Sequence, residues 1–538
     1  MKKTKTIIML ISLALAISAC GPAKESSYTM SINENLTKAS GINPGYGTMY
    51  EVFVYSFYDS DGDGIGDFNG LTAQLDYISD LGFDGIWLMP IMPSPTYHKY
   101  DVTDYYAIDP QYGTMADFEN FIFACDERGI RVIIDLVLNH SSSKHPWFLE
   151  ATRYLAGLDE REPNISECPE FDYYHFSQER KGGYYKVDGT DNWFYEGVFW
   201  SEMPDLNLAS DKLRAEIENI AAFWLDKGVA GFRLDAAKEF FTGSAESNIE
   251  VLSWFNRMVK EKKPDAYLVA EIWESAIAYA PYYSSGIDSI FNFAFANQNG
   301  IISETVRGKK AAGNFGTEMV SHDERMASYN PDFIDAPFYT NHDLGRSAGY
   351  YNGEFALAQA KMALALNLLM SGNTFTYYGD ELGMNGAGKD ENKRLPMDWY
   401  EDECVAGMCD GPPGKENVRK RYPSHEVQKE DPYSIFTYTQ NALKIRNAFS
   451  EIIQGKVINL PAIGTDNIAA FTKTDGDNQI TILANISSDE ETIQIAALGS
   501  EVASSPPDIV AVLLSDEIPV TMKDGLLKLP GYSIVILK

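Results

Sequence analysis

Short apolar segments alternate with amphipathic segments along most of this chain, and this alternation constrains the fold more than any other feature. Segments 83–91 and 131–138 are almost entirely apolar, and a helical pattern at 115–128 separates them. Strands that are apolar on both faces and joined by helices are typical of parallel sheets. The alternation resumes after residue 202 and gives about eight strands, which predicts a (β/α)₈ TIM barrel. A doubly wound open sheet is the alternative, but no glycine-rich phosphate-binding turn follows the first strand.

Two interruptions of this alternation predict further domains. Residues 141–202 are rich in Tyr, Gly, Pro, Asp and Trp and show no pattern for a long helix. They predict a loop-rich domain inserted after the third strand. Short strand patterns without helices begin near residue 455 and predict a C-terminal antiparallel β-sandwich domain at 451–538. The barrel then comprises residues 44–140 and 203–450.

The first twenty residues indicate export. Three lysines precede an apolar run at 7–17 that is too short to span a bilayer. The run ends in Ile17-Ser18-Ala19-Cys20, which resembles the lipobox of bacterial lipoproteins. That resemblance implies removal of residues 1–19 and lipidation of Cys20, and the polar residues 20–43 would form a flexible tether. We therefore expect an exported protein, lipid-anchored at the cell envelope and facing outward; a secretory signal with an incidental cysteine is the alternative.

Charge and cysteine content bear on partners and cofactors. The formal net charge of −33 makes nucleic acid and anionic membrane surfaces poor partners, so membrane attachment would come through Cys20 alone. No Cys/His spacing suggests zinc. Cys404 and Cys409 are close enough in sequence to close a small disulfide loop, whereas Cys125 lies in a helical pattern and is expected to be buried. We expect a monomer.

Ionisable side chains collect at the ends of the predicted strands. Arg233 and Asp235 end one strand on the same face, and the arginine would hold the carboxylate ionised, as a nucleophile requires. Taken alone, this pair could equally be structural. Other strands end in further polar or aromatic residues: Asp135, Asn139 and His140; Glu271 and Trp273; Asn341, His342 and Asp343. Because the carboxyl ends of barrel strands meet on one rim, we expect a single site.

The chemistry of this set favours glycoside hydrolysis. No Ser or Cys lies beside a base in the sequence pattern. Hydrolysis of a glycoside needs one ionised carboxylate and one protonated carboxyl group. Arg233 would keep Asp235 ionised, and the apolar run before Glu271 could raise the pKa of Glu271 by desolvation.

From about residue 50 to its C-terminus, the chain resembles the α-amylase family, glycoside hydrolase family 13. The family's short regions occur in order as Asp135-Leu136-Val137-Leu138-Asn139-His140, Gly231-Phe232-Arg233-Leu234-Asp235, Glu271-Ile272-Trp273 and Thr340-Asn341-His342-Asp343. The resemblance implies that Asp235 is the nucleophile, Glu271 the general acid/base and Asp343 a third carboxylate that holds substrate hydroxyls. It also implies substrate-side roles for Tyr100, His140, Arg233, Lys238 and His342. Because the family retains anomeric configuration, the carboxyl groups of Asp235 and Glu271 should lie about 5–5.5 Å apart.

An acidic loop near the first strand predicts a calcium site. Carboxylates that alternate with small residues can surround a hard cation. The resemblance implies a structural calcium held by Asp59, Asp61, Asp63 and Asp67 and by the carbonyl of Ile65. A metal-free loop of Asx-turns is the alternative. A second calcium, common in amylases, stays open, because Asn139 and Asp205 match two ligands but Glu239 stands where the family usually has histidine.

The bond specificity also stays open. Under the resemblance, Ala236 after the nucleophile favours α-1,4 over α-1,6 bonds. Asp101 and Arg394 could pair and wall off one end of the cleft, as in exo-acting members, or each could bind substrate or its neighbours. An outward-facing anchored enzyme suits a polymer too large to import, so we predict an endo-acting α-1,4-glucan hydrolase acting on α-glucan polysaccharides or oligosaccharides. The alternatives are an exo-acting α-glucosidase or oligo-1,6-glucosidase and, more remotely, a non-catalytic starch-binding lipoprotein.

Overall fold

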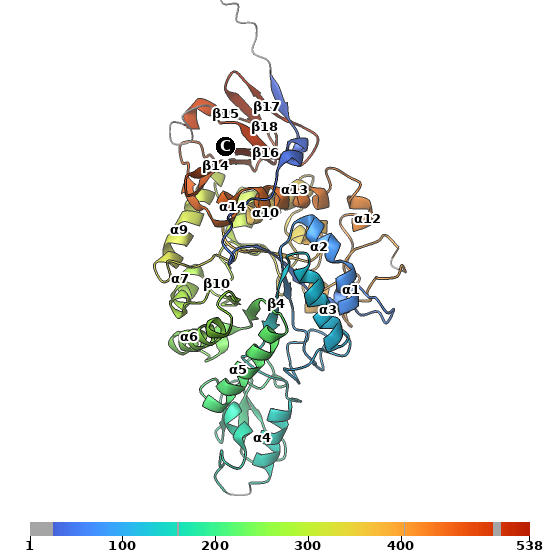
Figure 1. Ribbon diagram of the computed structural model, residues 1–538, viewed down its shortest axis with the longest axis vertical. Helices are drawn as coiled ribbons and strands as arrows, with labels where there is room; N and C mark the ends of the chain where they lie inside the picture. The colour runs from blue at the N-terminus through green and yellow to red at the C-terminus, as the bar shows by residue number, and fades with distance from the viewer. Residues whose placement is uncertain (1–24, 159–160, 403, 499–506) are drawn as a thin grey trace, which may run out of the picture.

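The computed structural model describes residues 25–158, 161–402, 404–498 and 507–538. The predicted signal peptide and Cys20 lie outside these residues. Of the helices in the described parts of the chain, none has the length and apolar character needed to cross a membrane. The molecule is elongated, with a β-domain at one end, the barrel in the middle and the inserted domain at the other end (Figure 1).

The barrel sheet is parallel and confirms the predicted fold. Its seven strands follow the order β10-β9-β8-β4-β3-β2-β11. Their bounds are Thr48–Val52 (β2), Gly85–Leu88 (β3), Arg131–Leu136 (β4), Gly231–Leu234 (β8), Tyr267–Ala270 (β9), Ser289–Ile290 (β10) and Thr374–Tyr377 (β11). The predicted strand at 337–340 is reduced to two parallel bridges, from Ala336 to Phe291 and from Phe338 to Phe375. These bridges join β10 to β11 and close the ring.

Helices surround the barrel, and the longer ones bury apolar side chains against it. In α5, the buried residues Leu213, Ile217, Ile220 and Trp224 recur at helical spacing. A capping box between Thr114 and Asp117 begins α3. The helices of the barrel domain are Phe68–Ala73 (α1), Leu75–Leu81 (α2), Met115–Asp126 (α3), Asp211–Asp226 (α5), Ala245–Lys262 (α6), Ala276–Tyr279 (α7), Ile301–Val306 (α8), Phe315–Ala327 (α9), Ala356–Leu368 (α10), Asp390–Lys393 (α11), His425–Gln428 (α12), Ile435–Ala448 (α13) and Ser450–Gln454 (α14).

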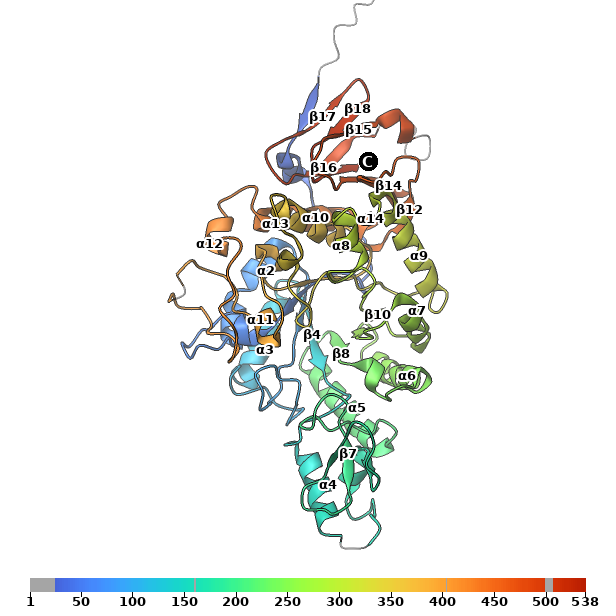
Figure 2. The same ribbon diagram turned by 180° about the vertical axis from the view of Figure 1, so that it is seen from behind.

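The inserted domain contains a helix that the sequence pattern did not predict. Helix α4 spans Pro146–Ala156 and packs beside a small antiparallel sheet of β5 (Phe176–Ser177), β7 (Phe194–Glu196) and β6 (Tyr184–Lys186). The expectation of a domain without a long helix was therefore wrong. The helix begins where the His145 side chain accepts the N–H of Trp147, with Pro146 in the first turn. Figure 2 shows α4 and β7 beyond β4 and β8 of the barrel.

The C-terminal domain consists of two antiparallel sheets with a shared apolar core, as predicted. The five-stranded sheet contains β12 (Lys456–Asn459), β13 (Ile468–Asp475), β14 (Asn478–Asn485), β19 (Ser533–Leu537) and β16 (Ile509–Leu513). The four-stranded sheet contains β1 (Ser26–Tyr28), β17 (Val520–Lys523), β18 (Leu526–Leu529) and β15 (Glu491–Gln494).

The prediction of a flexible tether over residues 20–43 is wrong for residues 26–35, which pack on the C-terminal domain. Strand β1 pairs with β17, and the 3₁₀ helix Met30–Asn35 packs on β16. The buried Asn33 amide donates to the Val512 carbonyl over 2.8 Å and accepts from the Val512 N–H over 3.2 Å. Met30 joins the core of the C-terminal domain. Residues 26–35 are ordered because they contribute both a strand and core contacts, and residues 20–24 of the predicted tether lie outside the described residues.

The cysteines differ from one sequence expectation. Cys404 and Cys409 are both free. Cys404 is exposed, whereas Cys409 is buried beside the acidic loop, where Asp410 donates its N–H to the Gly64 carbonyl. Cys125 is buried, as expected.

Candidate active site

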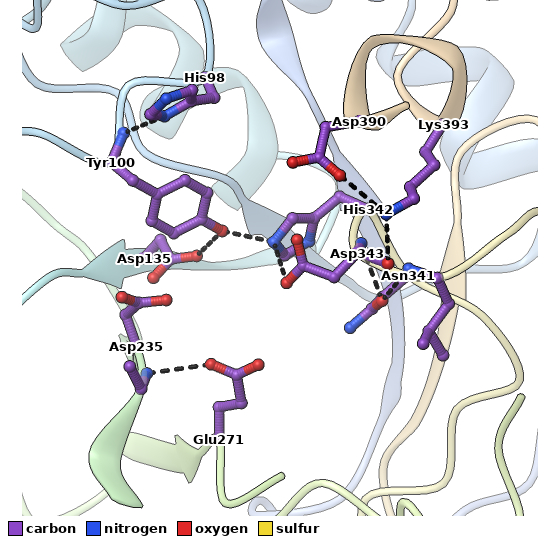
Figure 3. Close-up of polar contacts among 12 residues, drawn as sticks. His98, Tyr100, Asp135, Asp235, Glu271, Asn341, His342, Asp343, Asp390 and Lys393 are labelled. Carbon is purple, nitrogen blue, oxygen red and sulfur yellow. Dashed lines mark hydrogen bonds and ion pairs between the residues drawn. The ribbon is translucent and has the colours of Figure 1, made fainter. Parts of the chain in front are cut away.

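Arg233 lies at the centre of a group of carboxylates at the carboxyl ends of the barrel strands. Its guanidinium is completely buried. Nη1 lies 2.8 Å from Asp135 Oδ1 and 2.5 Å from Asp235 Oδ1, and Nη2 lies 2.9 Å from Glu271 Oε2. Three strand ends, β4, β8 and β9, therefore meet on one cation, and Figure 3 shows Asp135, Asp235 and Glu271 facing the same space.

The backbone of β8 brings these groups together. A Cβ at Gly231 would lie 1.8 Å from the Tyr267 carbonyl oxygen, so only glycine permits the close approach of β8 and β9. At the other end of the strand, Ala236 adopts φ of 44°, in the left-handed region that non-glycine residues rarely occupy. This turn directs the Ala236 N–H to Glu271 Oε2 over 3.0 Å. The strand thus positions both carboxyl groups.

Burial favours the protonated forms of Asp135, Glu271 and Asp343, and the neighbouring charges decide which of them stays ionised. Burial raises the pKa of Glu271, although the Arg233 charge opposes it. Burial also raises the pKa of Asp135 to about 7 against the same arginine. Burial disfavours the charged form of Asp343 too, but His342 and Arg394 outweigh it and hold the pKa of Asp343 below its usual range. The site thus combines a carboxyl group biased toward its protonated form with one held ionised.

The second half of the site is built around His342. Its Nε2 lies 2.7 Å from Tyr100 Oη and 3.1 Å from Asp343 Oδ2 (Figure 3). Tyr100 donates its hydroxyl to Asp135 Oδ2 over 3.0 Å and stacks on the His342 ring. These contacts connect the His342 group to the Arg233 group.

The pairing of Asp101 with Arg394 that the sequence allowed does not occur. Asp101 is buried and accepts hydrogen bonds from the hydroxyls of Ser94, over 2.6 Å, and Thr96. Arg394 Nη2 instead lies 3.0 Å from Asp343 Oδ1. The two residues are bound to different neighbours because Asp343 offers the guanidinium an ionised partner on the cleft side.

These groups open into a cleft of about 610 Å³. Of the sequence-predicted residues, Tyr100, His140, Asp235, Lys238, Glu271, Asp343 and Arg394 line this cleft. Arg233 and His342 are buried behind it and contact Asp235 and Asp343. Asp101 does not line it.

Sequence reasoning missed Phe199 and Trp200 of the lining and, although it placed Trp273 at a strand end, gave that residue no role. Phe199 and Trp200 of the inserted domain and Trp273 after β9 are 46–51% exposed and face the cleft. The Trp273 ring stacks on Phe293 with centroids 5.3 Å apart and planes at 16°. Flat aromatic faces suit the apolar faces of sugar rings. The aromatic-rich composition of the inserted domain was the available signal, but nothing in it identified the residues that face the cleft.

The acidic loop fits a cation with three of the four predicted carboxylates. Oxygens of Asp59, Asp61 and Asp67 lie within 4.8 Å of one another. Asp63 is outside this group and accepts the N–H of Ile65 over 2.8 Å. At the position of the second calcium, Asn139 donates to Asp205 over 3.2 Å, and Glu239 lies 3.5 Å from Lys238.

Comparisons with known proteins agree with this geometry. The family model described as "Alpha amylase, catalytic domain" matches residues 51–455. Alpha-amylase 3 of Dictyoglomus thermophilum is 38% identical over 466 residues, which cover 85% of this chain and 88% of the relative. A glucan 1,6-alpha-glucosidase of Streptococcus pneumoniae is 29% identical over 507 residues, with coverages of 83% and 92%.

Solved structures give the same result. Amy13B of Eubacterium rectale superposes with a TM-score of 0.91 at 47% identity and covers 96% of this chain and 99% of that one. The alpha-amylase from H. orenii has a TM-score of 0.78 at 34% identity, with coverages of 92% and 99%. Since the family model spans well over half of the chain and ends where the C-terminal β-domain begins, this chain belongs to the α-amylase family, glycoside hydrolase family 13.

Proposed function

We propose that this glycoside hydrolase is an α-amylase that cleaves internal α-1,4 bonds of starch and related α-glucans with retention of configuration. The observation that carries the proposal is the guanidinium of Arg233 bridging Asp235 and Glu271 at the floor of an open, aromatic-lined cleft. Paired carboxyl groups across one sugar-binding cleft are what a double displacement requires.

In the first step, Asp235 attacks the anomeric carbon while the bond to the leaving oxygen breaks. Glu271 donates its proton to that oxygen, since its raised pKa favours the protonated form. The product is a glycosyl ester on Asp235 and a free sugar hydroxyl. The separation of about 5–5.5 Å between the two carboxyl groups remains a prediction of this mechanism.

In the second step, the Glu271 carboxylate takes a proton from water, whose oxygen attacks the anomeric carbon. The ester bond to Asp235 breaks, Asp235 leaves as a carboxylate, and configuration is retained. Asp343 and His140 hold the hydroxyls of the distorted ring. His140 suits this role because it lines the cleft and its buried Nε2 has no hydrogen-bond partner among the described residues.

Two observations support endo action on a polymer. Exposed aromatic residues, Phe199, Trp200 and Trp273, offer stacking faces for several glucose units. The sequence of this chain is 38% identical to Alpha-amylase 3 of Dictyoglomus thermophilum but 29% identical to the glucan 1,6-alpha-glucosidase of Streptococcus pneumoniae. The test is a time-resolved product profile on starch, pullulan and isomaltose. We expect early malto-oligosaccharides and a rapid fall in iodine staining; glucose alone with persistent staining would establish exo action instead.

The acid assignment is tested by Glu271→Gln, which removes the transferable proton with little change in shape. We expect turnover of starch to fall by a factor of about 10³ or more while starch binding is retained. Glu274→Gln is the matched control. It alters an exposed carboxylate three residues after Glu271 that pairs with Lys238. Unchanged turnover in Glu271→Gln would overturn the assignment and favour a starch-binding protein without catalysis.

We further propose that Asp59, Asp61 and Asp67, together with the carbonyl of Ile65, hold a structural calcium ion, which would tie the loop after β2 together. We also propose that the chain is exported and anchored through a lipid on Cys20, on the basis of its first twenty residues.

A further inference from the structure

Glu51 is a buried carboxylate that neither the sequence motifs nor the proposed mechanism uses. It lies in β2 and is 1% exposed. Its Oε1 is 2.6 Å from Nδ1 of His342, a residue 291 positions further along the chain. An ionisable side chain buried at this depth is normally paired, and its partner here belongs to the active site.

The two nitrogens of the His342 ring face two different carboxylates. Nδ1 meets Glu51, whereas Nε2 lies 3.1 Å from Asp343 Oδ2 and 2.7 Å from Tyr100 Oη. A neutral imidazole has one N–H and would direct a lone pair at one of these carboxyl groups, which could pair with it only by holding a proton. Burial raises the pKa of Glu51, but the charge on His342 opposes this shift. An imidazolium donates from both nitrogens and satisfies both sides.

We propose that Glu51 is a positioning residue that holds His342 as a doubly protonated ring, and that this ring in turn fixes Tyr100 and Asp343 for the substrate. The proposal rests on the proposed function only for the substrate-side roles of Tyr100 and Asp343. With a proton on Nε2, the Tyr100 oxygen accepts from His342 and its own hydroxyl is free to donate to Asp135 over 3.0 Å. Without that proton, Nε2 would compete with Asp135 for the tyrosine hydroxyl.

The surroundings of the ring favour the charged form. Glu51 faces it from β2, Asp343 from its own loop and Tyr100 from the loop after β3. Trp87 of β3 packs edge-on at 5.7 Å. Of the other charged groups nearby, Asp135 of β4 pairs with Arg233 of β8 over 2.8 Å, and Arg394 pairs with Asp343 over 3.0 Å. Burial opposes the charge, but Asp343 and Glu51 together raise the pKa of His342 to about 9.

Nitrogen-15 NMR of the histidine-labelled enzyme without substrate tests the protonation state directly. The chain has seven histidines, and His342→Gln assigns the signal of interest. At about pH 8, where an ordinary histidine is neutral, we expect both ring nitrogens of His342 to carry protons. In Glu51→Gln we expect the pKa of this ring to fall by about one unit or more. A neutral His342 ring in the wild-type enzyme at this pH would overturn the proposal, whether or not the variant folds.

Kinetics separate positioning from a general effect of losing a buried carboxylate. We expect Glu51→Gln to lower kcat/KM by about tenfold or more in the wild-type enzyme. In a His342→Gln background, we expect Glu51→Gln to lower kcat/KM by less than a further factor of about two, because both substitutions remove the same interaction. Glu381→Gln is the matched control, because Glu381 is equally buried but accepts hydrogen bonds from the hydroxyls of Tyr50 and Tyr77. Equal effects of Glu51→Gln with and without His342 would overturn the coupling. Failure of the endo-amylase proposal would appear in the product profile instead, and any α-glucoside that is turned over serves for these measurements.

Discussion

At the scale of single residues, one guanidinium contacts three buried carboxyl groups. Arg233→Met would leave Asp135, Asp235 and Glu271 without their common cation. We expect the free energy of unfolding to fall by about 3–5 kcal/mol and turnover to be lost, because uncompensated buried charges are costly. Urea unfolding and kcat/KM measure the two effects.

Two controls sharpen this prediction. Arg233→Lys keeps the charge, but a point charge cannot reach three carboxylates at once, so we expect turnover to remain low. Arg446 is also wholly buried but donates to backbone carbonyls such as those of Leu368 and Met370. Arg446→Met should lower stability and leave kcat/KM of the folded enzyme unchanged. Wild-type turnover in Arg233→Met would contradict the central role of this residue.

At the scale of elements, the loop after β2 is the candidate for metal-dependent stability. Calcium bound only to the folded state would stabilise the enzyme by about 2.7 kcal/mol at a free concentration one hundred times Kd. We therefore expect a chelator to lower the Tm and added calcium to restore it. Asp61→Asn should abolish this response, whereas Asp63→Asn, outside the converging group, should keep it. An unchanged Tm on chelation of the wild-type protein would contradict the proposed site.

At the scale of the whole molecule, the N-terminal segment is part of the C-terminal domain, far from the inserted domain (Figure 1). Asn33→Ala removes three hydrogen bonds, two with Val512 and one with the Asn441 side chain, and leaves the N–H and carbonyl of Val512 unpaired in a buried place. We expect a loss of about 2 kcal/mol in the free energy of unfolding, with kcat/KM unchanged. Asn35→Ala changes an exposed residue of the same 3₁₀ helix and should have little effect. Equal unfolding midpoints for the two variants would contradict this account.

Elements with a strong local pattern were predictable, and elements that depend on distant partners were not. Helix α5 was predicted at residues 211–227 and found at Asp211–Asp226, because its apolar stripe and its cap lie within the segment. The seventh barrel strand was predicted at 337–340, yet this segment forms only bridges. Strand β1 was missed altogether, since three residues become a strand only when β17 pairs with them.

The sequence by itself determined the alternation of strands and helices and the acidic residues at the strand ends, because both follow from local periodicity and the chemistry of neighbouring side chains. Only the tertiary structure decided which of these residues meet. It paired Arg394 with Asp343 and not with Asp101, placed Glu51 against His342, and aimed Trp273 and the aromatic residues of the inserted domain into the cleft. The reason is that such contacts join segments far apart in the chain, and only the closure of the barrel brings them within a few ångströms.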